Sequence, residues 1–181
     1  MKTSQSPSLP ERLKLERPLV VFDIEATGLN KRTDRIVAIA IVRYEPDGSV
    51  EQFAYLLNPG TPIPEEATQI HGITDDDVRE APTFAEMADV LTAHFDGADL
   101  AGYNILGYDI QMLAEEFTRA GRTFSLEGRR ILDAQRIFFR NEPRDLSAAL
   151  RYYCGAEHEE SHDDVVHHVP GLDPTPMRTS Q

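Results

Sequence analysis

The chain has 181 residues, 40% of them hydrophobic, and a formal net charge of -13 at pH 7. A chain of this length can bury a substantial core, and one domain is the natural expectation. The charge excludes a broad basic surface that grips nucleic-acid phosphates, so a nucleic-acid protein of this composition needs bound cations or a small local cluster of arginines. The single cysteine, Cys154, excludes an internal disulfide and is expected to be packed rather than reactive.

The hydropathy pattern predicts a protein without a membrane partner. No run of about 18 or more apolar residues occurs, and the N-terminal stretch lacks the apolar segment of a signal peptide. We therefore expect a cytoplasmic protein. Residues 1–17 are expected to form a flexible lead-in, residues 18–169 the folded domain, and residues 170–181 an irregular, proline-containing tail.

The predicted elements begin with three strands. Apolar runs start at Pro18, Arg35 and Val50, and the Asp47-Gly48 turn makes the second and third strands an antiparallel hairpin. Residues 61–74 contain two prolines and are predicted to be a proline-punctuated connection.

Helices and strands then alternate. Apolar residues at helical spacing predict helices over residues 83–95, 108–121 and 144–155, a buried strand over 98–104, and a strand running into a helix over 129–139. Three strands followed by alternating helices and strands predict an α/β fold, a sheet covered by helices.

Two acids interrupt the first apolar strand. Asp23 and Glu25 lie two residues apart, so the alternation of a strand places both on one face, where their charges repel each other. A divalent cation between them would relieve this repulsion, and carboxylate oxygens suit Mg²⁺ or Mn²⁺. A pair of solvated acids at a strand end is the plain alternative.

Three motifs in order place the pair in a wider pattern. D-x-E-x-T-G covers residues 23–28, P-x-x-x-x-x-x-H-G-I covers residues 64–73, and N-x-x-x-[FY]-D covers residues 104–109. With the strand order, they resemble the DEDD-type 3′-5′ exonuclease family, in its DEDDh subfamily, which is related to the proofreading epsilon subunit of bacterial DNA polymerase III.

The resemblance implies a ribonuclease H-like fold, a five-stranded mixed sheet with strand two antiparallel. It also implies release of nucleoside 5′-monophosphates from 3′ ends of DNA or RNA, preferably single-stranded, by two Mg²⁺ or Mn²⁺ ions, with a DNA polymerase as a possible partner. The implied metal ligands are Asp23, Glu25 and Asp109, the implied base is His162, and the implied substrate-binding residues are Thr27, Gly28, His71 and Asn104.

Each implied role has a structural alternative. Asp109 can be an acid favoured by the N-terminus of a helix. His71 can close a turn, and Asn104 can position the loop before Asp109 without touching substrate. Thr27 and its glycine neighbour can be an ordinary strand end. Asp133, which also matches a family acid, is predicted to cap a helix.

The last motif of the subfamily, H-x-x-x-x-D, is incomplete. It aligns on His162, but His167 stands where the acid is expected, and prolines that follow limit the helix to about two turns. Three explanations are open: a shifted pairing of His158 with Asp163, substitution of the acid by His167 or Asp164 as a metal ligand, or a divergent or frameshifted ending.

Two other functions compete with exonuclease activity. An incomplete metal site favours a non-catalytic or weakly active module that binds nucleic acid or protein, whereas the intact acids of the first two motifs favour the enzyme. A nuclease of the same fold that cuts internally would release oligomers instead of mononucleotides.

Overall fold

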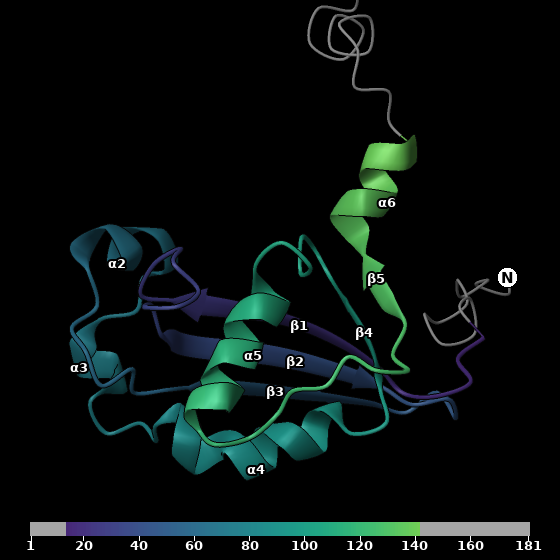
Figure 1. Cartoon of the computed structure of the whole chain (residues 1–181), viewed down its shortest axis with the longest axis horizontal. Coiled ribbons are helices and arrows are strands. Elements are labelled where there is room, and N and C mark those ends of the chain that lie inside the picture. Colours follow the sequence, from purple (N-terminus) through teal and green to yellow (C-terminus); the bar gives the residue numbers. More distant parts are fainter. Residues whose placement is uncertain (1–13, 142–181) are drawn as a thin grey trace, which may run out of the picture. The chain divides into compact units, whose positions relative to one another are not determined.

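A computed structural model describes residues 14–141, which contain a five-stranded mixed sheet (Figure 1). The strand order is β3-β2-β1-β4-β5. β1 pairs antiparallel with β2 and parallel with β4, β2 pairs antiparallel with β3, and β4 pairs parallel with β5. The predicted α/β fold with strand two antiparallel is confirmed. The strands are β1 (Leu19–Ala26), β2 (Ile36–Tyr44), β3 (Val50–Leu56), β4 (Asp99–Gly102) and β5 (Ile131–Asp133).

The alternation of β1 gives the strand one apolar face and one face that carries two acids. Val20, Phe22 and Ile24 are buried in the main core, whereas Asp23 is exposed and Glu25 is partly exposed. Successive strand residues point to opposite faces, so the two acids share the face that the core does not occupy. The turn after β2 also forms as predicted: Ser49 N and Oγ donate to Asp47 Oδ1 at 2.8 and 2.7 Å.

Two helices cover the apolar face, α4 (Phe84–Phe95) and α5 (Asp109–Arg119) (Figure 1). Aromatic rings of the helices and the sheet pack against one another in edge-to-face pairs. The Phe22 and Phe95 ring centroids lie 5.2 Å apart, and those of Phe84 and Phe117 lie 5.0 Å apart. Edge-to-face packing adds to the burial of these large apolar surfaces, so the helices are firmly fixed on the sheet.

The proline-punctuated connection over residues 61–74 contains a helix that the sequence did not predict, because half of this segment lies in α2 (Glu65–His71). Pro64 occupies the N-cap with φ of -59°, where proline is compatible with a helix start, and two glutamates in the first turn favour the helix dipole. Gly72 ends the helix in the left-handed conformation, with φ of 77°. Thr74 then starts the short α3 (Asp75–Val78) with a capping box to Asp77.

The last described helix, α6 (Ala134–Asn141), follows β5 directly. Asp133 Oδ1 accepts from Gln135 N at 3.1 Å, so the predicted helix cap is confirmed. The predicted helix over residues 144–155 and Cys154 lie outside the described residues. The domain boundaries at 18 and 169, with the lead-in and the tail, stay predictions. Among residues 14–141, no helix is long and apolar enough to cross a membrane.

Candidate active site

The fold brings three acids to one end of β1. Asp23 and Glu25 lie in the strand, and Asp109 is the first residue of α5. Asp109 Oδ1 accepts a hydrogen bond from the backbone N–H of Ile24, the residue between the two strand acids, at 3.3 Å. This contact joins positions 85 residues apart in the sequence. The acid of the second motif therefore bonds to the backbone between the two acids of the first motif.

Asp109 is an unusual carboxylate because only 4% of its surface is exposed. Burial raises its pKa to about 6, and the charges of Asp23 and Asp133 act in the same direction, against the N–H groups that bind it. No described Lys or Arg pairs with Asp23, Glu25 or Asp109. The three carboxylates therefore lack a protein countercharge in the described part of the chain.

These acids suit a divalent cation by chemistry. Carboxylate oxygens without a cationic partner are the hard donors that Mg²⁺ and Mn²⁺ prefer. Within residues 14–141, however, no three His, Cys, Asp or Glu side chains are grouped so that they could hold a metal ion. The described residues thus supply carboxylate donors for a metal ion but do not form a complete coordination site.

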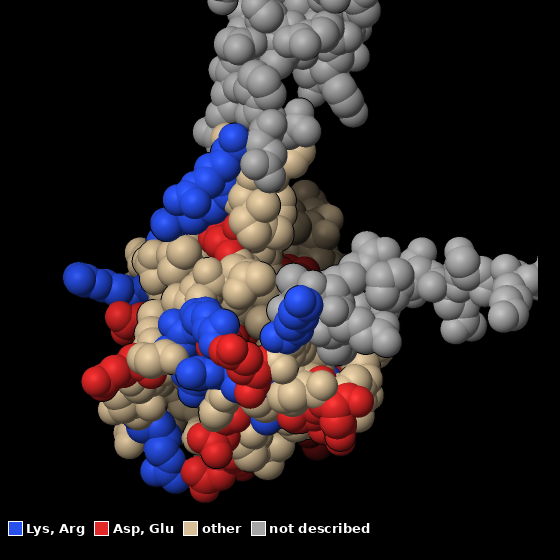
Figure 2. Space-filling model, turned by 90° about the vertical axis from the view of Figure 1, so that its right-hand side faces the viewer, with Lys and Arg blue, Asp and Glu red and all other residues tan. Residues whose placement is uncertain are grey.

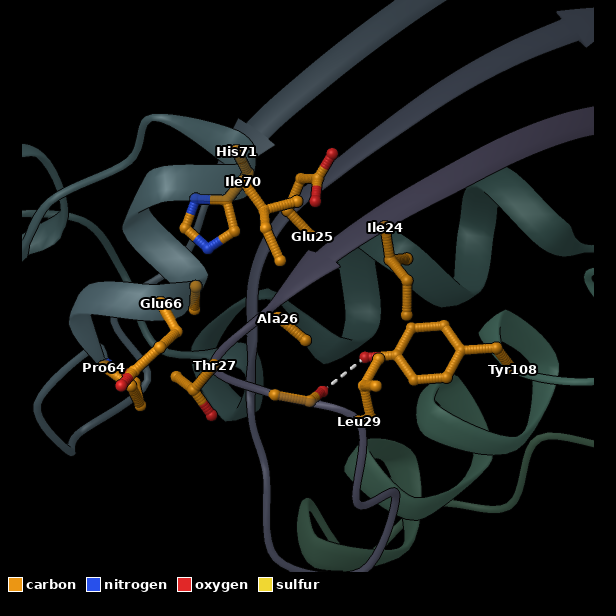
Figure 3. Close-up of a pocket in the computed structure, with 12 residues that line it drawn as sticks. Ile24, Glu25, Ala26, Thr27, Leu29, Pro64, Glu66, Ile70, His71 and Tyr108 are labelled. Atoms are coloured by element: carbon orange, nitrogen blue, oxygen red, sulfur yellow. Dashed lines mark hydrogen bonds between the residues drawn. The ribbon is translucent and has the colours of Figure 1, made fainter.

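A pocket of about 310 Å³ lies beside Glu25, which is part of its lining (Figure 3). Its size is at the lower end of the range for small-molecule sites. Figure 3 shows that β1 and the loop after it form a wall of the pocket, with α2 on one side and Tyr108 on the other. Leu29 lies on this loop and Ile70 lies on α2, and both are 84% exposed and line the pocket, so they give it an apolar rim. Its lining includes Ile24, Glu25, Ala26, Thr27, Pro64 and Ala67.

His71 lines the pocket from the end of α2. Its Nδ1 accepts from Ile73 N at 3.0 Å, so it does close a turn. A neutral ring whose Nδ1 accepts carries its hydrogen on Nε2. Among the described side chains, His71 Nε2 is the one buried nitrogen or oxygen that has no hydrogen-bond partner. Such a group is costly unless a ligand or water satisfies it, which favours a contact with something bound in the pocket.

Thr27 and Gly28 lie at the junction between β1 and the following loop. Thr27 is buried, and its Oγ1 accepts from Arg35 N at 3.0 Å, so the structure gives it a loop-closing contact. A side chain at Gly28 would place its Cβ 2.4 Å from Asp34 Oδ2, an oxygen already bound to Asn30 N. A larger residue here would displace the Asp34 carboxylate from this bond, so close packing favours glycine, and both residues line the pocket.

Asn104 is exposed and belongs to the loop between β4 and α5. It has φ of 59°, a left-handed conformation that asparagine tolerates, and its carbonyl accepts from Gly107 N and Tyr108 N. Asp133 accepts from Asn104 N at 2.9 Å and from Leu106 N at 3.2 Å, so it fixes this loop as well as capping α6. The described contacts of Asn104 position the segment that leads to Asp109.

Sequence reasoning missed the role of Tyr108. Its hydroxyl donates to the Gly28 carbonyl at 2.6 Å, across the pocket wall (Figure 3). Burial, followed by the charges of Asp34, Asp109 and Glu25, raises the pKa of Tyr108 to about 12, so the hydroxyl keeps its proton. The motif indicated an aromatic ring at this position, but nothing in the sequence indicated a bond to a residue 80 positions away.

Sequence reasoning also missed Glu116, which is 1% exposed and lies on the same helix as Asp109. It accepts from Arg35 Nε and Nη2 at 2.7 and 3.1 Å and from Ile36 N at 3.2 Å. The spacing of seven residues from Asp109 puts both acids on one face of α5, which is a signal that the sequence did contain.

A second hollow, of about 220 Å³, lies on the open face of the sheet beside the acids. Ala40 pairs with Asp23, Ala38 pairs with Glu25, and Ala54 continues the row on β3. These small side chains leave space next to both carboxylates. The predicted base His162 and the candidate ligands Asp163, Asp164 and His167, with His158, lie outside the described residues.

The sequence of the chain is similar to those of several known proteins. The chain is 40% identical over 108 residues to a DNA polymerase III subunit epsilon-like protein of Rhodobacter capsulatus, which covers 58% of the chain and 15% of that protein. It is 32% identical over 97 residues to the DNA polymerase III subunit epsilon of Treponema pallidum, covering 54% of the chain and 45% of that protein. The matched part is less than half the length of these relatives.

Solved structures share the fold. E. coli exonuclease I in complex with a dT13 oligonucleotide aligns with a TM-score of 0.58 at 20% identity, over 65% of this chain and 28% of that one. Exonuclease I in its apo form aligns with a TM-score of 0.62 at 18% identity, over 68% and 30%. Residues 20–165 match the family described as Exonuclease. Since this match covers most of the chain, the chain belongs to the exonuclease family, and the predicted resemblance is confirmed.

Proposed function

We propose that the protein is a metal-dependent 3′-5′ exonuclease that hydrolyses the terminal phosphodiester of single-stranded nucleic acid and releases nucleoside 5′-monophosphates. The observation that carries the proposal is the bond from Ile24 N to Asp109 Oδ1, because it joins the acid of α5 to the strand that holds Asp23 and Glu25. Membership of the exonuclease family supports the same reaction.

Asp23, Glu25 and Asp109 would hold one or two Mg²⁺ or Mn²⁺ ions. Bound there, the ions would supply a water with lowered pKa and stabilise negative charge on the phosphodiester. Asp23 is exposed on the open face of β1, so it can be shared between two ions. Asp109 is buried and held by Ile24 N, so its carboxylate would be fixed before any ion arrives. A cation would also offset the cost of ionising Asp109 in its buried position.

The pocket would take the terminal nucleoside. Leu29 and Ile70 would offer aliphatic surface to a base, a contact that needs no particular base sequence. His71 Nε2–H is an unused donor on the same lining and can bind a sugar or phosphate oxygen. Thr27 and Gly28 would lie beside the terminal sugar. The proton acceptor for the attacking water, proposed as His162, lies outside the described residues.

The local charge supports contact with phosphates despite the net charge of -13. Figure 2 shows Lys and Arg side chains along α6 and on the body of the domain below it, among acidic ones. Arg136 and Arg140 are exposed and one helical turn apart, and neither pairs with a described acid. Exposed arginines of this kind can neutralise backbone phosphates.

Product analysis tests the proposal. A single-stranded oligonucleotide labelled at its 5′ end would be incubated with the full chain in Mg²⁺, in Mn²⁺ and in EDTA. We expect a ladder that shortens from the 3′ end by one nucleotide at a time, and nucleoside 5′-monophosphates as products, in both metals but not in EDTA. Internal fragments without mononucleotides would contradict it in favour of an endonuclease. Retention of the strand without hydrolysis would favour the binding module.

A DNA polymerase is a partner to test on the same preparation. Two relatives are named as DNA polymerase III subunits or subunit-like proteins, and the chain matches less than half of each. If the chain acts in proofreading, it should remove a mispaired 3′ terminus faster than a paired one. Equal rates on both termini would contradict a proofreading role without contradicting exonuclease activity.

A further inference from the structure

Two consecutive residues at the start of α5 hold the end of β1. Asp109 Oδ1 accepts from Ile24 N at 3.3 Å, and the Tyr108 hydroxyl donates to the Gly28 carbonyl at 2.6 Å. The segment between these contacts carries Glu25 and the first part of the pocket wall. Both ends of residues 24–28 are therefore attached to the same helix.

The loop that follows this segment is attached to the same helix further along. Arg119 Nη1 and Nη2 donate to the carbonyls of residues 31, 32 and 34, at 3.3, 2.7 and 3.2 Å respectively. Glu116 accepts from Arg35 and from Ile36 N at the end of the loop. Three side chains of α5 and its N-terminal flank thus fix the loop at its beginning, middle and end.

The Tyr108 contact is the member of this set nearest the site. Gly28 directly precedes Leu29, whose exposed side chain forms one rim of the pocket. Of the described side chains, Tyr108 alone bonds to Gly28, and the next fixed point is Asn30 N on Asp34 Oδ2. Tyr108 directly precedes Asp109, so the hydroxyl helps to set the place of Leu29 relative to this acid. The backbone before Gly28 is also held, because Thr27 N donates to Arg35 O at 2.9 Å and Arg35 N donates to Thr27 Oγ1 at 3.0 Å.

We propose that Tyr108 is a positioning residue whose hydroxyl aligns the Gly28–Leu29 wall of the nucleotide pocket with the acids. The inference rests on the proposed function, in which the wall receives the terminal nucleoside and the acids hold the metal ions. Its consequence is specific: the hydroxyl supports binding of the terminal nucleotide, while the chemistry at the acids depends on it little.

Tyr108→Phe removes the hydroxyl and keeps the ring. The variant should fold, because the ring can still pack and because the motif accepts either aromatic residue. Loss of one hydrogen bond corresponds to about five-fold in an equilibrium constant. We expect KM for a single-stranded oligonucleotide and Kd for thymidine 5′-monophosphate to rise about five-fold, with kcat within about two-fold of the natural protein. Tyr103→Phe is the matched control, because Tyr103 is 61% exposed and bonds to no described residue.

A second variant reaches the same loop from another point. Arg119→Met removes the bonds to residues 31, 32 and 34 and the ion pair with Glu116 at 3.3 Å. Glu116 keeps its bonds to Arg35, so the variant should raise KM with little change in kcat. Amide hydrogen exchange gives a readout that does not need activity. In both variants we expect faster exchange at residues 28–34 and unchanged exchange in α4.

The outcomes separate the inference from the proposed function. An unchanged KM in Tyr108→Phe, or a fall in kcat with KM unchanged, would overturn the positioning role in an active enzyme. If the natural protein releases no mononucleotides, the proposed function fails. Amide hydrogen exchange and thymidine 5′-monophosphate binding then test the positioning role of Tyr108 without activity. Unchanged exchange at residues 28–34 in Tyr108→Phe would overturn the inference, and faster exchange with weaker nucleotide binding would support it.

Discussion

Asp109→Asn should stabilise the metal-free protein at neutral pH. The folded pKa of Asp109 is about 6, above the ordinary value of 3.8, because the side chain is buried next to other acids. The difference corresponds to about 3 kcal/mol as an upper bound. Asparagine has no charge to bury and can still accept from Ile24 N through Oδ1. We therefore expect the free energy of unfolding to rise by about 1–3 kcal/mol at pH 8.

The pH dependence gives the sign of the effect. Because the folded pKa is raised, the unfolded chain loses this proton first as the pH rises from about 4 to about 6. The natural protein should lose stability relative to the variant across this window, and the two should be equally stable below about pH 4. Urea unfolding in EDTA at several pH values measures the difference in unfolding free energy between the two proteins. Glu115→Gln, on the same helix, is the matched control. A variant less stable than the natural protein at pH 8 would refute the reasoning, since Asp109 would then be a structural acid.

Further predictions concern the acid Asp23, the exposed arginines of α6 and position 167. Asp23→Asn in EDTA should leave the melting temperature unchanged or higher, since the Asp23 charge is one cause of the raised pKa of Asp109; a marked decrease in thermal unfolding scans would mean that Asp23 is structural. Replacing Arg136 and Arg140 by Ala should weaken binding of long single strands and reduce the salt dependence, log Kobs against log salt, by about 1 in slope; an unchanged slope in fluorescence titrations would exclude phosphate contacts there. His167→Asp should raise Mg²⁺-dependent activity about tenfold if position 167 is the missing ligand, and an unchanged rate would favour one of the other two endings.

Much of the fold follows from local sequence. The period-two pattern of β1 places Asp23 and Glu25 outside and Phe22 inside, and this alternation alone sets which face carries the acids. The Asp47-Gly48 turn and the Asp133 cap are local contacts of the same kind. Helix α2 was not predicted because proline usually interrupts a helix. Pro64, however, stands at the start of α2, where proline is compatible with helical geometry.

The site was less predictable than the fold. The motifs identified Asp109, but its burial and its bond to Ile24 depend on how α5 packs against β1. The same holds for the Tyr108 hydroxyl and for Glu116, whose partners are about 80 residues away in the sequence. Such contacts follow from tertiary packing, which neither periodicity nor turn chemistry reports.

The most direct test of the central claim is the rate of mononucleotide release by Asp23→Ala. Asp23 is exposed on the open face of β1 and bonds to no described side chain, so the variant should keep the far-ultraviolet circular dichroism and cooperative unfolding of the natural protein. If Asp23 holds the catalytic metal ions, release of nucleoside 5′-monophosphates from a 3′ end in Mg²⁺ or Mn²⁺ should fall below detection. Undiminished release by a folded Asp23→Ala protein would contradict the metal-dependent exonuclease assignment.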